Sequence, residues 1–310
     1  MKIGAHMSVA GGVSSAIDRA ERHGCETLQI FTKNASRWQG PPVSAPEAER
    51  FARRLDETGI APVFSHASYL INLASADPGL RQQSIDAFAD ELDRADALNL
   101  AGVVLHPGTQ TSGSLDEAFE LVATGVVEAW RRQPVRRTMV VLEHTAGQGR
   151  VLGHRFEHLA SMLSAIGSHA KMGVCLDTCH LCAAGYDIAT PESYAQTFAE
   201  FDGTIGIDRL RLFHANDSKT PCGSRVDRHA HIGDGHVGLE PFRWLLHDSR
   251  FSGLPMVIET RKTGALQRPG VDVVDPLDAK NLETLRSLRA SSIVGNTQSD
   301  EHSRHRNVVR

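Results

Sequence analysis

Eight short apolar runs recur along the chain, and polar segments with helical patterns of apolar residues lie between them. The runs cover residues 2–6, 27–31, 63–66, 103–106, 140–143, 174–177, 210–214 and 256–259. From the third run onward, their last residues are 40, 37, 34, 37 and 45 positions apart. This is about the length of one strand, one helix and two loops, and it predicts a single-domain α/β protein, a (β/α)8 TIM barrel. The alternative is an open doubly wound sheet, which would gather site residues at one or two switch points.

The segments between the runs predict helices, and the end of the chain has a different character. Apolar residues at helical spacing indicate helices around 84–92, 119–127 and 156–166. Thr190 before Pro191 and Asp275 before Pro276 have the side chain and the following proline typical of a helix start. The last helix is expected over 276–288, so the barrel domain should span 1–288. The polar remainder, 289–310, is predicted to be a disordered or loosely attached tail.

The composition limits the class of protein. A hydrophobic fraction of 41% and a charged fraction of 23% are ordinary for a soluble globular chain. Five cysteines, three of them within eight residues, fit reduced thiols better than a disulfide framework. The N-terminus has no signal-peptide pattern, and no apolar stretch is long enough to span a bilayer. We therefore expect a cytoplasmic monomer that makes no contact with membranes.

The third to the eighth run each end in a histidine or a carboxylate, and three more such residues follow in loops. The nine residues are His66, His106, Glu143, Asp177, His180, His214, Asp227, His229 and Glu259. A single histidine at a strand end is more often a hydrogen-bonded structural residue than a ligand. Six placements at the same end of one barrel favour convergence on one mouth, where four carboxylates would repel one another unless cations were bound. Imidazole and carboxylate ligands suit zinc, manganese or iron, so the sequence predicts a multinuclear metal site.

Longer motifs around these residues resemble those of a known family. They are FTKN at 31–34, SYLINL at 68–73, HPG at 106–108, TAGQG at 145–149, DTCH at 177–180, AAGYD at 183–187, HANDSK at 214–219 and GSRVDRH at 223–229. From Met1 to about Thr260 the chain is similar to endonuclease IV (deoxyribonuclease IV), the zinc-dependent apurinic/apyrimidinic endonuclease family. All nine residues fall on the ligand positions of that family.

The resemblance implies three zinc ions, some replaceable by manganese or iron. His66 and His106 would hold the first ion, with Glu143 as the catalytic bridge to a second. Asp177, His214 and Glu259 would complete the second site, while His180, Asp227 and His229 would hold the third. The implied substrate is duplex DNA with an abasic site, cut on the 5′ side to leave a 3′-hydroxyl and a 5′-deoxyribose phosphate. Removal of 3′-phosphate and 3′-phosphoglycolate groups is also expected.

Loops around the barrel mouth are expected to contact DNA. The expected contact residues are Lys33, Arg37, Trp38, Tyr69, Leu70, Arg225 and Arg228. Tyr69 and Leu70 offer an aromatic and an apolar wedge, and an abasic nucleotide has little stacking to lose on extrusion. Plain loop packing is an equally weighted alternative for Trp38 and Tyr69. The formal net charge of −4 is weak evidence against a DNA partner, because three divalent cations would change it to +2.

Three departures from the family pattern bear on the site. Ser36 stands where the family usually has an arginine two residues before the tryptophan, and Arg37 is displaced by one position. His144 follows Glu143 where asparagine is usual; side chains alternate along a strand, so it should point away from Glu143. Cys182 replaces a residue that is usually aromatic.

Two other functions and one other cofactor remain as alternatives. A metal-dependent sugar isomerase or epimerase could use a similar barrel, although it needs fewer ligands. A non-catalytic protein that binds damaged DNA would not need nine ligands. Cys175, Cys179 and Cys182 have the spacing of a radical S-adenosylmethionine iron–sulfur site. Cys175 is expected inside a strand, one layer below Asp177, from which it could not join the other two thiols.

Overall fold

Eight parallel strands close into a barrel in the computed structural model, which describes residues 1–133, 136–263 and 273–291. Around the barrel the strands follow the order β1-β10-β7-β6-β5-β4-β3-β2. Their bounds are β1 Lys2–Met7, β2 Thr27–Ile30, β3 Val63–His66, β4 Gly102–Leu105, β5 Met139–Glu143, β6 Met172–Asp177, β7 Leu210–His214 and β10 Pro255–Ile258. Each lies on one of the eight predicted runs, so the predicted (β/α)8 barrel is confirmed.

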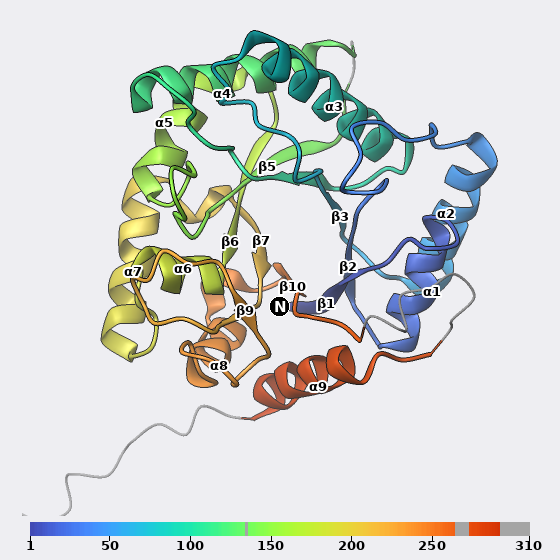
Figure 1. The fold of residues 1–310 in the computed structure, drawn as a ribbon. Coiled ribbons are helices and arrows are strands. Elements are labelled where there is room, and N and C mark those ends of the chain that lie inside the picture. The colour runs from blue at the N-terminus through green and yellow to red at the C-terminus, as the bar shows by residue number, and fades with distance from the viewer. Residues whose placement is uncertain (134–135, 264–272, 292–310) are drawn as a thin grey trace, which may run out of the picture.

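Helices form an outer ring around these strands, as the view along the barrel in Figure 1 shows. The α-helices are α1 Ser14–Arg22, α2 Ala45–Thr58, α3 Pro78–Ala97, α4 Leu115–Arg131, α5 Phe156–Ile166, α6 Thr178–Ala184, α7 Pro191–Thr204, α8 Glu240–His247 and α9 Pro276–Ala290. Short 3-10 turns cover Gly167–His169, Ile207–Arg209 and Ser249–Phe251. The two predicted N-caps are confirmed: Thr190 accepts from the Ser193 N–H and Asp275 from the Leu277 N–H.

The last helix continues two residues beyond its predicted end, to Ala290. Arg289 explains the extension, because its guanidinium donates to the Met1 carbonyl at 3.0 Å and to the Glu26 carboxylate at 2.6 Å. The final helical turn is thereby joined to the start of the chain. Most of the predicted tail, 292–310, lies outside the described residues, so the tail and the domain boundary at 288 stay predictions.

The barrel interior contains an apolar layer with one residue from each of six strands. This layer consists of Phe64, Val104, Val141, Cys175, Leu212 and Val257. Successive side chains of a strand point to opposite faces, so the residue two positions further along points into the barrel again. On all six strands that next residue is a histidine or a carboxylate of the predicted site. The register of the fold therefore directs these six side chains to the mouth.

A small second sheet carries part of the loop that follows β7. Its strands are β8 Asp217–Ser218 and β9 His229–Ala230, which pair antiparallel with Ser218 opposite His229. This pairing returns the chain to the barrel mouth and fixes the backbone at His229. Within the described ranges, no helix combines the length and apolar character that a membrane span requires.

Candidate metal centre

The nine predicted ligand residues meet at the carboxyl end of the barrel strands, where they form three adjacent groups. In each group the ligand atoms all lie within 4.8 Å of one another. Glu143, at the end of β5, is fully buried and belongs to two of the groups. Its two carboxylate oxygens face different partners, so this one side chain connects the first ligand group to the second.

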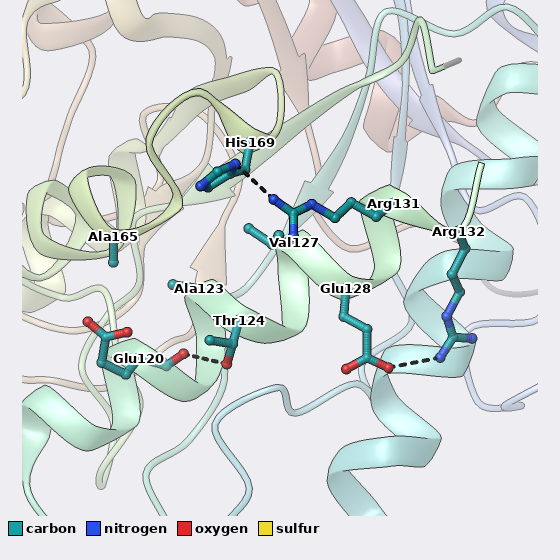
Figure 2. Close-up of a pocket in the computed structure, with 9 residues that line it drawn as sticks. All are labelled: Glu120, Ala123, Thr124, Val127, Glu128, Arg131, Arg132, Ala165 and His169. Carbon is teal, nitrogen blue, oxygen red and sulfur yellow. Dashed lines mark hydrogen bonds and ion pairs between the residues drawn. The ribbon is translucent and has the colours of Figure 1, made fainter. Parts of the chain in front are cut away.

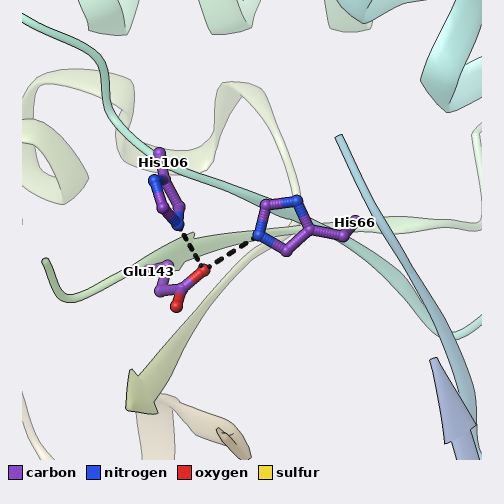
Figure 3. A group of neighbouring side chains, drawn as sticks. All are labelled: His66, His106 and Glu143. Atoms are coloured by element: carbon purple, nitrogen blue, oxygen red, sulfur yellow. Dashed lines mark hydrogen bonds and ion pairs between the residues drawn. The ribbon is translucent and has the colours of Figure 1, made fainter. Parts of the chain in front are cut away.

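The first group consists of His66, His106 and Glu143 (Figure 3). The Nε2 atoms of His66 and His106 lie 3.1 and 3.0 Å from Glu143 Oε2. His66 donates its Nδ1–H to the Ala67 carbonyl at 2.8 Å, and a carbonyl can only accept. That bond keeps the Nε2 lone pair of His66 directed at the group, which is the arrangement typical of a metal-binding histidine.

The second group joins Glu143 to Asp177, His214 and Glu259. His214 Nδ1 lies 2.9 Å from Glu143 Oε1 and 3.1 Å from Glu259 Oε2. On the other side of the ring, Nε2 contacts Gln29 Oε1 at 2.9 Å. Since an amide oxygen only accepts, the ring proton is on Nε2 and the Nδ1 lone pair faces the three carboxylates.

The third group consists of His180 from α6, Asp227 from the loop after β8, and His229 from β9. His180 and His229 place Nε2 3.2 Å from opposite oxygens of Asp227. His180 donates Nδ1–H to the His144 carbonyl at 2.8 Å. Asp227 and His229, two residues apart, therefore bring both side chains to one point beside His180.

This donor set fits divalent cations. Among the described residues, the buried Nε2 atoms of His180 and His229 have no hydrogen-bond partner, although a carboxylate lies close to both. A lone pair facing a carboxylate is repelled unless a positive charge lies between them. Imidazole nitrogens and carboxylate oxygens are the ligands that zinc, manganese and iron accept. His66 and His180 also donate Nδ1–H to backbone carbonyls, and metal-binding histidines usually make such a hydrogen bond with the ring nitrogen that does not face the metal.

The carboxylates and imidazoles of the centre shift one another's protonation strongly. Burial opposes charge on Glu143, yet His214 and His106 hold the pKa of that carboxyl well below its usual range. Burial also disfavours the imidazolium of His229, but Asp177 and Asp227 outweigh it and raise its pKa to about 9. The pKa of His180 is raised well above the ordinary value for the same reason, through Asp177, Asp227 and Glu143. Cations that bind here must displace protons from these rings.

Several polar residues that support the centre were not found from the sequence. Gln29 on β2 holds both His214 and Glu259 through the two ends of its amide. Asn216 donates to Asp177 Oδ2 at 2.6 Å and accepts from the Glu259 backbone N–H at 2.9 Å. The inward alternation of β2 was a usable signal for Gln29, since Gln29 pairs with His6 in register.

Asp217 supports the third group from outside. The carboxylate is fully buried and accepts backbone N–H groups at 2.7 to 3.3 Å from Ser218, Gly233, Gly235, Val237 and Gly238. These bonds fix the turn after β9, and β9 carries His229. No sequence signal separated this aspartate from the ligand aspartates.

One of the expected DNA contacts, Lys33, does not lie at the surface. Lys33 is buried, and its ammonium lies 2.8 Å from both Asp90 and Glu91 of α3. Two carboxylates thus neutralise this lysine and tie the loop after β2 to the helix, an arrangement that does not favour a phosphate contact. In the same loop Arg37 is exposed, whereas Trp38 is partly buried against the core.

The other expected DNA contacts lie at the surface. Tyr69 is 68% exposed and Leu70 is 37% exposed. The Tyr69 ring packs 5.7 Å from that of His66 and 5.4 Å from that of Phe31, which holds it beside the first ligand group. Arg225 and Arg228 are both exposed in the loop that brings Asp227 to the centre. Whether these residues bind DNA stays a prediction.

The departures and the cysteines have clear positions. His144 packs its buried ring against Phe156 and Tyr186, away from Glu143, and burial lowers its pKa to about 3. Cys175 lies in the apolar layer of the barrel, separate from Cys179 and Cys182 on α6. No group of possible metal ligands among the described residues contains two of these cysteines, so the iron–sulfur alternative has no structural support.

A groove elsewhere on the molecule contains none of the predicted residues. It has a volume of about 570 Å³ and lies on the outer wall, between α4 and the end of α5. Figure 2 shows its lining, in which Arg131 donates to His169 and Arg132 pairs with Glu128. The groove is thus remote from the ligands at the barrel mouth.

Comparison with known proteins identifies the family. Residues 17–289 match the family model of the xylose isomerase-like TIM barrel. A probable endonuclease 4 from Chloroflexus aurantiacus is 48% identical over 287 residues, covering 93% of this chain and 98% of the relative. The crystal structure of endonuclease IV from Thermus thermophilus superposes with a TM-score of 0.80 at 35% identity, covering 93% and 98% of the two chains.

A D-tagatose 3-epimerase-like protein has a similar barrel fold but a different sequence. Its crystal structure matches 93% of this chain and 97% of its own with a TM-score of 0.67, but at only 20% identity. That likeness extends to the fold alone, so it gives no support to the sugar-isomerase alternative. By sequence, fold and the resemblance of its motifs, the chain belongs to the endonuclease IV family of apurinic/apyrimidinic endonucleases.

Proposed function

We propose that this protein hydrolyses the phosphodiester on the 5′ side of an abasic site in duplex DNA, using three divalent cations, of which zinc is the principal one. The observation that carries the proposal is the position of Glu143 between two ligand groups, with a third group beside them. Its Oε2 faces His66 and His106, whereas its Oε1 faces His214. A carboxylate in this position can hold two cations at the short spacing that two-metal phosphodiester hydrolysis requires.

In the proposed function, each ligand group would hold one cation. When bound, the cations supply a water of lowered pKa and neutralise the charge of the phosphate and of the leaving oxygen. His66, His106 and Glu143 would hold the first, and Asp177, His214 and Glu259 would complete the second. His180, Asp227 and His229 would hold the third. Hydrolysis by this ligand set would need no serine or cysteine nucleophile.

The rim of the mouth supports a DNA substrate. Tyr69 and Leu70 form an exposed aromatic and apolar pair next to the first group. Inserted into a duplex, such a pair would take the place of stacking at the damaged position, where an abasic nucleotide costs little to extrude. Arg37, Arg225 and Arg228 are exposed cations for phosphate contacts along the strand.

The decisive experiment maps the cut in an end-labelled duplex that contains one abasic site. The expected product carries a 3′-hydroxyl and a 5′-deoxyribose phosphate, and a chelator should abolish its formation. The same duplex without the lesion is the matched control. Cleavage on the 3′ side, or equal cleavage of the undamaged duplex, would refute the proposed specificity.

The number and identity of the cations can be measured separately. Elemental analysis of the purified chain should find close to three divalent ions, mainly zinc, with some exchange for manganese or iron. A content of one ion per chain would contradict the division into three groups. Release of 3′-phosphate and 3′-phosphoglycolate from nicked duplexes tests the second predicted activity with the same protein.

A further inference from the structure

Two loops at the barrel mouth contact each other beside the third ligand group. The loop after β5 contains Gln148 and His154, and the loop after β8 contains Arg225 and Asp227. Gln148 Oε1 accepts the Asp227 backbone N–H at 3.3 Å. His154 Nε2 lies 2.7 Å from an Nη atom of Arg225. The first loop therefore supports the second both at a ligand residue and at a surface arginine.

The hydrogen bonds of His154 fix which ring nitrogen carries the proton. Nδ1 lies 3.0 Å from the Val151 carbonyl, which can only accept, so Nδ1 is protonated. A guanidinium can only donate, so Nε2 accepts from Arg225. Burial, followed by the nearby charges of Arg225 and Arg155, lowers the pKa of His154, which keeps the ring neutral near pH 7. The His158 ring, 4.7 Å away, also has its pKa lowered by burial, to about 4, and adds no charge.

The backbone on both sides of the contact is held in place. Gly147 has a φ of +77°, and a Cβ at that position would approach the His154 side chain to 2.8 Å, so the ring packs directly on the glycine. Arg225 has a φ of +55°, which non-glycine residues seldom adopt, and its N–H donates to the Ala183 carbonyl at 2.8 Å. The turn therefore presents the arginine side chain in one direction, toward His154.

The charge of Arg225 stays available for a ligand. Among the described residues no carboxylate pairs with its guanidinium, and the side chain is exposed. A neutral acceptor restrains the position of the guanidinium without cancelling its charge. An aspartate in the place of His154 would neutralise the arginine, and an apolar residue would leave it free to rotate.

We propose that His154 is a positioning residue, which holds Arg225 in the orientation that grips a phosphate of bound DNA beside the third ligand group. The inference rests on the proposed function and extends it to a specific contact on the substrate. The arginine is ordered before binding, so the complex loses less side-chain entropy when the phosphate arrives. His154 itself touches no substrate atom and takes no part in the chemistry.

The tautomer of His154 can be tested without DNA. Two-bond proton–nitrogen spectra of the full chain with labelled histidine should show the ring neutral at pH 7, with Nδ1 protonated and Nε2 bare. His154→Phe, which removes the signal, assigns it. Arg225→Ala should shift the Nε2 resonance, whereas Arg228→Ala should leave it unchanged. A ring protonated at Nε2, or one insensitive to Arg225→Ala, would overturn the inference.

The effect on substrate is tested by a double-mutant cycle on the incision of abasic duplex. His154→Phe should raise KM about tenfold, the size expected for one lost hydrogen bond to a charged group, and should change kcat little. Arg225→Ala should raise KM at least as much, and the double variant should add little to it. His154→Gln keeps an acceptor oxygen and should recover part of the loss.

Arg228 provides the matched control, because it lies in the same loop and has no contact with His154. Arg228→Ala and His154→Phe should have additive effects on KM. If the wild-type chain cuts abasic DNA but His154→Phe and Arg225→Ala are also additive, the positioning role is wrong and the proposed function stands. If the wild-type chain with its cations cuts no abasic duplex, the proposed function fails and the positioning role falls with it.

Discussion

Replacement of Glu143 by glutamine is the sharpest test of the centre. The change keeps the shape of the side chain but removes a buried negative charge that faces His66 and His106 on one side and His214 on the other. The first ligand group is then left with two imidazoles, and two protein ligands do not hold zinc firmly. The second group retains Asp177, His214 and Glu259. The variant should therefore lose one of three cations.

The expected loss of activity follows from the same contacts. Removal of one preorganised electrostatic contact in an active site costs about 10²- to 10³-fold in rate. In the proposed function the carboxylate of Glu143 would serve two cations, so kcat should fall by about 10³-fold or more, which corresponds to about 4 kcal/mol of transition-state stabilisation. Binding of abasic duplex should change much less, because Tyr69, Leu70 and the exposed arginines are unaltered.

The assay combines elemental analysis, single-turnover incision and a binding titration on the same preparation. Glu91→Gln is the matched control, since Glu91 is another buried glutamate but binds Lys33, Thr32 and the Ser68 N–H instead of the ligand groups. That control should retain three cations. A Glu143→Gln variant with three cations and incision at the wild-type rate would refute the bridging role.

Three further outcomes are expected. Burial raises the pKa of the Cys175 thiol to about 12, so the thiol is a poor metal ligand. Elemental analysis of the Cys175→Ala variant should therefore still find three cations. Loss of a cation in this variant would contradict the reasoning. The double variant Tyr69→Ala, Leu70→Ala should have a KM for abasic duplex about tenfold higher or more, because it loses stacking on the bases. Steady-state assays should show a smaller effect on kcat. The pKa of His229 is raised to about 9 in the folded protein, whereas a histidine in an unfolded chain has a pKa of about 6.5. Protonation of His229 therefore stabilises the cation-free fold at low pH. As the pH rises from about 6.5 to 9, the melting temperature of the chelated protein should therefore decrease. Over the same range, the increase in melting temperature caused by added zinc should become larger. A melting temperature of the chelated protein that does not change with pH in calorimetry would contradict this prediction.

The barrel and the six residues of the site at strand ends could be predicted for the same physical reason. A parallel strand buried on both faces reads as a continuous apolar run, so the runs themselves gave the strand positions. Two-residue alternation then determines which side chain points inward past the apolar layer. Val141 and Glu143 illustrate this, because the first lies in the layer and the second at the mouth. Local sequence was sufficient here, because it determines both the position of a strand and which of its side chains point into the barrel.

Contacts between distant segments could not be predicted in this way. Lys33 looked like a surface cation, yet Asp90 and Glu91, which neutralise it, lie 57 and 58 residues away on α3. Gln29 is an amide with no metal-binding signature, and its role depends on where His214 and Glu259 come to lie. The ring nitrogen that each histidine offers depends in the same way on which carbonyl lies behind it.

The fold and the cations are physically linked through the charge at the mouth. Below the ligand groups lies an apolar layer, and above it Glu143, Asp177 and His214 are fully buried. Carboxylates in such surroundings are costly unless positive charge accompanies them, and within the described ranges the ion-pair partners of Glu143 and Asp177 are all histidines. The positive charge must then come from protons on the imidazoles or from cations that replace them. Cation binding therefore adds to the stability of the same strands that position the site, so loss of cations should loosen the mouth before the outer helices.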